Sequence, residues 1–171
     1  GLSVGSYGKR IPRIYLEASP ADRIALLQGL MDGDGSVSKT NNRLTYHTVA
    51  AKLADDVREL VEGLGGIASV KDYDRSDEDK PTDYVVRMRL PTWAPPFRIS
   101  RKASRYKPGS PAMPTRTFES VEYVRDVESV CIAVDAPDHL YVTEHCIVTH
   151  NTLQAIGLFH HLKARGEVTG M

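Results

Sequence analysis

The spacing of apolar residues predicts two amphipathic helices in the N-terminal part of the chain. Ile24, Leu27, Leu30 and Met31 fall on one helical face. This helix has its start signals at residues 19–22, where a serine can cap it, a proline suits its first position and an aspartate lies three residues after the cap. A second helix is predicted where apolar residues share a face ahead of two glycines that end it: Leu53, Val57, Leu60, Val61 and Leu64.

Segments of β-like composition alternate with these helices. Residues 43–48, 67–70 and 83–90 are predicted strands, and a charged loop over residues 74–81 joins the last two. These segments contain both helices and strands, and we expect an α+β fold on the family resemblance given below.

The C-terminal part of the chain has a different pattern. Residues 107–114 are rich in proline and glycine and are typical of a linker between modules. Residues 118–134 then alternate in a β manner, and residues 136–139 form a predicted turn. Short strands are expected at 140–142 and 146–148. We therefore expect three parts, at residues 1–116, 117–151 and 152–171.

Composition and charge exclude little. The chain has 171 residues with 41% apolar and 26% charged residues, which is ordinary for a globular protein. Lysine plus arginine equals aspartate plus glutamate at 22 each, so net charge alone predicts neither nucleic-acid nor membrane binding. No apolar run resembles a signal peptide or a membrane span, so we expect a cytoplasmic protein without a membrane partner. Cys131 and Cys146 are expected as reduced thiols, with one disulfide as the alternative.

The end of the first predicted helix carries candidate metal ligands. Residues 27–35 contain three glycines, which are costly in a helix unless another helix approaches closely or the chain must turn sharply. Asp32 and Asp34 lie at the C-terminal end, where carboxylates oppose the helix dipole. A divalent cation with a preference for oxygen ligands, such as Mg²⁺, would explain them.

These nine residues resemble the signature helix of LAGLIDADG homing endonucleases, with matching positions at Gly29, Leu30, Asp32, Asp34 and Gly35. The resemblance implies an αββαββα half-domain whose helix packs against a second such helix. It also implies that the last acidic residue of each helix binds metal ions at the scissile phosphates of double-stranded DNA, while the sheets lie in the major groove. By this resemblance Asp34 is the metal ligand and Asp32 a structural residue at the helix end.

Two basic segments are candidates for DNA contacts. Lys9 and Arg10, followed by Ile-Pro, resemble the block that precedes the second of two such helices in inteins. A further run contains five basic residues and no acidic one: Arg98, Arg101, Lys102, Arg105 and Lys107. A solvated surface without a partner is the alternative for this run.

Residues 150–152, His-Asn-Thr, have the chemistry for self-cleavage. The Asn151 side-chain amide can attack its own carbonyl, which forms a succinimide and breaks the chain after it. His150 can act as general acid for the leaving amine. The Thr152 hydroxyl can accept an acyl group once it is activated.

Residues 130–151 resemble the two C-terminal blocks of an intein, the Hint-type splicing domain. Cys131 together with Thr149 resembles the subtype in which an internal cysteine attacks the upstream splice junction. The resemblance implies that Cys131 receives the upstream segment as a thioester, that Thr152 takes it over as an ester, and that cyclisation of Asn151 releases the intein. The remaining N-terminal intein part and the N-extein would then be partners of this chain.

Other interpretations exist for the cysteine and histidine residues of this segment. Cys131 between valine and isoleucine is typical of a buried structural cysteine. A zinc site would lack the close pairing of ligands that zinc sites usually have, and would use Cys131, His139, His145 and Cys146.

The last predicted part is an amphipathic helix that begins on Thr152. Residues 152–156, Thr-Leu-Gln-Ala-Ile, resemble the start of the helix after the P-loop in Swi/Snf-type helicases. This resemblance implies an intein inserted into a Walker A motif. The alternative is an arbitrary helix that follows an intein. The function expected from the whole sequence is protein splicing with an associated DNA endonuclease; the alternative is a non-cleaving DNA-binding module with an inert splicing segment.

Overall fold

The computed structural model describes residues 5–108, residues 132–150, and between them residues 115, 117, 119, 120, 122, 123, 125, 128 and 130. The chain divides into two compact units, Gly1–Thr117 and Phe118–Met171. In the described part of the chain, no helix is both long enough and apolar enough to cross a membrane.

The two long helices of the first unit form where the apolar pattern predicts them. α2 spans Pro20–Asp34, and its cap is Ser19, whose Oγ accepts a hydrogen bond from the backbone N–H of Asp22 at 3.2 Å. α3 spans Ala51–Gly63 and turns its apolar face to the core. The shorter helices are η1 (Ser6–Gly8), α1 (Arg13–Leu16), η2 (Ser76–Glu78) and α4 (Ser100–Ala103).

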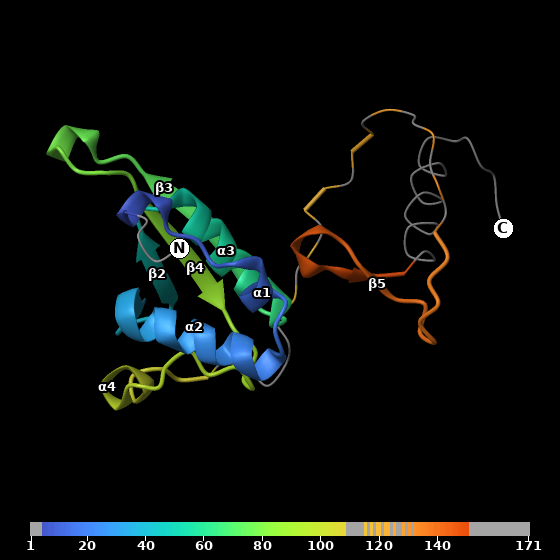
Figure 1. The fold of residues 1–171 in the computed structure, drawn as a ribbon, viewed down its shortest axis with the longest axis horizontal. Helices are drawn as coiled ribbons and strands as arrows, with labels where there is room; N and C mark the ends of the chain where they lie inside the picture. The colour runs from blue at the N-terminus through green and yellow to red at the C-terminus, as the bar shows by residue number, and fades with distance from the viewer. Residues whose placement is uncertain are drawn as a thin grey trace. The chain divides into compact units, whose positions relative to one another are not determined.

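Four antiparallel strands form the sheet of this unit (Figure 1). Their order in the sheet is β1-β2-β4-β3. β4 is therefore an inner strand, where Val86 pairs with Tyr46 on one side and Val70 on the other. The strands are β1 (Gly35–Val37), β2 (Leu44–Thr48), β3 (Ile67–Tyr73) and β4 (Asp83–Arg89).

The core lies between one face of this sheet and helices α2 and α3. Leu27 and Met31 of α2 pack in it with Val57 of α3 and with Tyr46 and Val86 of the sheet, all at most 2% exposed. Because side chains alternate between the two faces of a strand, the residues between these buried ones face away from the helices. The opposite face of the sheet is thus left open in this unit.

The first unit confirms the α+β prediction and the predicted helices and strands, and it adds one strand. β1 begins at the residue after the last residue of α2. Gly35 permits this change because a Cβ at this position would lie 2.6 Å from Met31 Cα. The sequence shows no strand pattern here, since three residues are too few for an alternation to be recognised.

The second unit contains a short antiparallel pair, β5 (Tyr141–Val142) and β6 (Val148–Thr149). One prediction is wrong here: Cys146 lies in the turn η3 (Glu144–Cys146) and not in a strand. Both His145 and Cys146 have positive φ, at 60° and 53°, because the chain must reverse between the strands. The described residues from 119 to 134 are also in no strand, since alternation provides no partner for a hydrogen-bonded ladder.

Candidate functional site

Asp34 is an exposed carboxylate at the C-terminal end of α2. No other described residue donates a hydrogen bond to it. Burial raises the pKa of the neighbouring Tyr46 hydroxyl to about 12, with a further contribution from the Asp34 charge. The end of α2 therefore presents one carboxylate that is held by a rigid helix and is available to a ligand.

Asp32 has a different environment. Its carboxylate accepts hydrogen bonds from the backbone N–H groups of Arg98 and Ile99, each at 3.2 Å. These two residues directly precede α4. Asp32 therefore connects the end of α2 to the segment that leads into α4. Of the two predicted metal ligands, Asp34 is the one whose oxygens accept no backbone hydrogen bond from this segment.

Lys102 of α4 lies against the C-terminal end of α2. The last carbonyl groups of a helix have no partner within it and carry partial negative charge, to which Asp32 and Asp34 add theirs. The Lys102 ammonium group lies within hydrogen-bond distance of four backbone carbonyl oxygens and shares its three N–H donors among them: Met31 (2.9 Å), Asp32 (2.8 Å), Gly33 (3.2 Å) and Gly35 (2.7 Å). Lys102, which the sequence predicts as a DNA contact, thus lies at the C-terminal end of α2.

The other members of the basic run are exposed side chains. Arg98, Arg101, Arg105 and Lys107 surround α4 without a carboxylate partner among the described residues. The Lys107 backbone N–H donates to Asn42 Oδ1 at 2.9 Å. These four charges are accessible to a ligand, and their role as DNA contacts stays a prediction.

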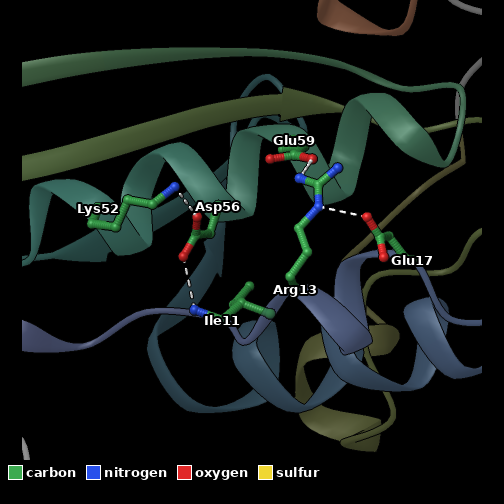
Figure 2. Close-up of polar contacts among 6 residues, drawn as sticks. All are labelled: Ile11, Arg13, Glu17, Lys52, Asp56 and Glu59. Atoms are coloured by element: carbon green, nitrogen blue, oxygen red, sulfur yellow. Dashed lines mark hydrogen bonds and ion pairs between the residues drawn. The ribbon is translucent and has the colours of Figure 1, made fainter.

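Lys9 and Arg10 are exposed in an extended segment. The next residue of this segment, Ile11, is hydrogen-bonded to Asp56 of α3 (Figure 2). The Asp56 carboxylate, in a residue that is 1% exposed, accepts hydrogen bonds from the Ile11 backbone N–H at 2.8 Å and from Lys52 Nζ at 2.5 Å. Next to it, Arg13 forms ion pairs with Glu17 and Glu59. These contacts determine where the two basic side chains emerge.

The open face of the sheet is mostly polar and carries four basic residues and one acidic residue, and it was not predicted from the sequence. Basic residues on a strand alternate with core residues and therefore form no run in the sequence. The alternation of polar and apolar residues at 83–89 was the available signal. A hollow of about 520 Å³ lies on this face, with the apolar side chain of Val85 among its lining residues. The residues of the open face are Ser36, Arg43, Thr45, His47, Ile67, Ser69, Lys71, Tyr73, Asp83, Val85, Arg87 and Arg89.

The second unit places two of the predicted splicing residues. Thr149 ends β6 and His150 follows it. The rings of His150 and His139 pack edge to face, with centroids 6.4 Å apart. Cys131, Asn151 and Thr152 lie outside the described residues.

No cluster of three or more histidine, cysteine, aspartate or glutamate side chains in the described part of the chain is arranged to hold a metal ion. His139, His145 and Cys146, which the zinc alternative needs, do not form one. A metal site that uses Asp34 therefore takes its remaining ligands from outside the described residues or from bound DNA and water.

Comparison with known proteins finds a family match over the region that contains α2, α3 and the sheet strands. Residues 21–90 match the LAGLIDADG-like domain. The match runs from the first turn of α2 to the residue after β4. It supports an endonuclease module that binds DNA, and members of this family generally use divalent metal ions.

Two relatives resemble larger parts of the chain. The chain is 31% identical over 156 residues to "Replicative DNA helicase DnaB" of Mycobacterium intracellulare, which covers 88% of this chain and 27% of that protein. It is 29% identical over 89 residues to "Uncharacterized protein MJ1054" of Methanocaldococcus jannaschii, which covers 50% of this chain and 10% of that protein. The first similarity extends beyond the LAGLIDADG-like domain into the second unit. The chain spans only a small part of either relative.

Proposed function

We propose that the chain is part of a self-splicing intein and that its LAGLIDADG-like domain is a site-specific DNA endonuclease. The observation that carries the endonuclease is Asp34, a carboxylate at the end of the signature helix with no other described hydrogen-bond donor. The open, basic face of the sheet supports DNA binding by the same domain.

Asp34 fits a divalent cation because it is an exposed oxygen donor. A bound Mg²⁺ would polarise the scissile phosphate and lower the pKa of an attacking water. Other residues of this chain orient Asp34. Gly35 allows the chain to leave α2 sharply, and Asp32 and Lys102 keep the end of the helix in place.

A second helix is needed to complete such a site, and α2 has a face that suits one. Ala25, Gly29 and Gly33 are exposed, four residues apart, and lie opposite the buried Leu27 and Met31. Nothing in the described structure lies within 4 Å of a Cβ built on either glycine. A second LAGLIDADG helix could therefore approach α2 closely there and provide the second acidic ligand.

The splicing proposal assigns Cys131 as the first nucleophile, Thr152 as the acyl acceptor and Asn151 as the residue that cyclises, with Thr149 and His150 beside it. The edge-to-face packing of His139 and His150 supports a histidine environment next to Asn151. The name of the helicase relative supports a helicase as the host protein, and it favours a replicative helicase over the Swi/Snf type. In this proposal residues 152–171 belong to the host.

A non-cleaving DNA-binding module with an inert splicing segment is the alternative. The open sheet face is equally suited to it, and the accessible carboxylate of Asp34 favours cleavage. A nicking assay with Mg²⁺ on DNA of the uninterrupted helicase gene separates the two functions.

The chain, joined to its upstream part, should cut this DNA, and Asp34→Asn should lower the rate by more than about 100-fold, because a direct metal ligand is lost. Asp32→Asn is the matched control: its amide oxygen can still accept hydrogen bonds from the backbone of residues 98–99, so cleavage should persist. Unchanged cutting by Asp34→Asn would remove Asp34 from the site. Binding without cutting by the unmodified protein would establish the alternative.

A further inference from the structure

We propose that Arg87 reads a guanine in the DNA bound to the open sheet face, while Arg43 and Arg89 contact phosphates. This inference rests on the proposed DNA-binding function and assigns a specificity-determining residue to it. Three features of the structure distinguish Arg87 from the other basic residues: its place in the sheet, its hydrogen bond and the residues on either side of it.

Arg87 lies on the inner strand β4, on the open face of the sheet. The residues directly across from it are short and polar, Thr45 on β2 and Ser69 on β3. On the far side of Thr45 lies Ser36 of β1, and the hydroxyl oxygens of Ser36 and Thr45 are hydrogen-bonded at 2.7 Å. Such short neighbours leave Arg87 accessible from this face. A major groove admits a two-stranded β-ribbon, whose side chains can contact the base edges.

The Arg87 guanidinium is already oriented in the structure. Its Nη2 donates a hydrogen bond to the Tyr73 hydroxyl at 2.6 Å, and Lys71 Nζ lies 5.3 Å from the centroid of the Tyr73 ring. A long side chain that is held before binding loses less conformational entropy when it binds. After this bond, four of the five N–H donors of the guanidinium remain, and guanine needs two of them for O6 and N7.

These donors are not engaged by a carboxylate. In the described part of the chain Arg87 forms no ion pair, whereas Arg13, Arg58 and Arg75 each pair with an acidic residue. A paired arginine must first be separated from its partner, and an unpaired one on a surface attracts the DNA without this cost.

The surroundings of Arg87 differ between its two sides. On one side it lines a hollow of about 200 Å³ together with Arg43, Arg89 and Ser69, and no carboxylate lines this hollow. On the other side, the larger hollow is lined by three carboxylates, Asp74, Glu78 and Asp83, as well as by Arg43, Arg75 and Arg87. The first hollow has only basic charges and attracts a phosphate more strongly than the second, where His47 is hydrogen-bonded to Asp83 at 2.9 Å. Arg87 therefore lies beside the region that attracts the DNA backbone, in a position from which it can contact base edges.

The test uses the full chain and a library of DNA duplexes with randomised sequence. The unmodified protein should select guanine at one position. Arg87→Lys keeps the positive charge but loses the planar pair of donors, so the selection for guanine should fall about tenfold or more. Affinity for unselected duplexes should stay within about twofold, because the phosphate attraction depends on charge.

Two further variants are matched controls. Arg43→Lys should keep the guanine selection, and Arg43→Ala should weaken binding to all duplexes and lower the salt dependence by about one released ion. Tyr73→Phe, which leaves the Arg87 side chain unheld, should reduce the selection without lowering the affinity for unselected DNA.

An unchanged selection profile in Arg87→Lys would overturn the inference while the DNA-binding function stands, as would an equal loss of affinity for all sequences in Arg87→Ala. A folded, unmodified chain that binds no duplex would overturn the proposed DNA-binding function as well. Circular dichroism identifies any variant that fails to fold, and Tyr73→Phe, which removes one hydroxyl, then supplies the decisive comparison.

Discussion

Asp56 is a buried carboxylate whose position in the chain gives no sign of its role. It lies on the α3 face that packs in the core, at 1% exposure, and a buried charge is costly unless it is paired and hydrogen-bonded. Its partners are the Ile11 backbone N–H and the Lys52 ammonium group (Figure 2). Asp56 thereby connects the segment with Lys9 and Arg10 to α3.

Asp56→Ala should lower the free energy of unfolding by about 1–3 kcal/mol, because the buried Ile11 N–H loses its acceptor. Asp56→Asn should lower it less, since the amide oxygen can still accept this bond. The Lys52 side chain is 65% exposed, so its ion pair contributes little. Urea unfolding can be followed by the fluorescence of Trp93, the single tryptophan of the chain. Equal losses in the two variants would instead assign the stability to the ion pair.

At the scale of the element, the end of α2 combines features that are unfavourable in an isolated helix. It has two acidic residues in its last turn and no basic residue there. Lys102 offsets this from α4, by donating to the carbonyl oxygens at the helix end, and Asp32 accepts the backbone N–H groups that precede α4. The end of α2 and α4 therefore form one structural unit, with Asp34 at its surface.

Lys102→Met keeps most of the alkyl chain but removes the ammonium donors. The unfolding free energy should fall by about 1–3 kcal/mol, and DNA cleavage should fall with it because Asp34 loses its fixed position. Arg101→Met on the same helix is the control for stability, since Arg101 is exposed and a surface change is usually worth no more than about 0.5 kcal/mol. Equal effects of the two substitutions on the unfolding free energy would contradict the assignment of Lys102 to the helix end.

At the scale of the whole molecule, the two units correspond to two proposed chemistries. The LAGLIDADG-like domain match lies within the first unit, and Thr149 and His150 lie in the second. Each unit has its own hydrogen-bonded sheet. Substitutions in one unit should therefore leave the chemistry of the other intact.

In the chain joined to its upstream part, Asn151→Ala should stop release at the downstream junction, because no side-chain amide remains to cyclise. Cys131→Ala should remove the thioester intermediate and upstream cleavage. Gel analysis of the products with and without hydroxylamine, which cleaves thioesters, measures both steps.

Asp34→Asn should splice normally, and a loss of splicing in this variant would show that the two chemistries are coupled. Normal splicing by Cys131→Ala would exclude the internal-cysteine subtype.

The sequence by itself determined the elements of the first unit and its signature helix. Ser19 and Pro20 start α2, the apolar spacing of α3 selects its buried face, and the glycines and aspartates near Asp34 distinguish the end of α2. These signals are local, since they depend on residues within one or two helical turns of each other. The resemblance to the LAGLIDADG family followed from such a local pattern.

Only the tertiary structure decided which polar groups are used inside the fold and which remain available to a ligand. Lys102 and Met31 are 71 positions apart, and Asp56 and Ile11 are 45 apart, so neither contact has a signature in the sequence. Strand order decides which side chains neighbour Arg87, and the helices decide which face of the sheet stays open. Contacts of this kind depend on the packing of the whole unit, which periodicity within a segment does not contain.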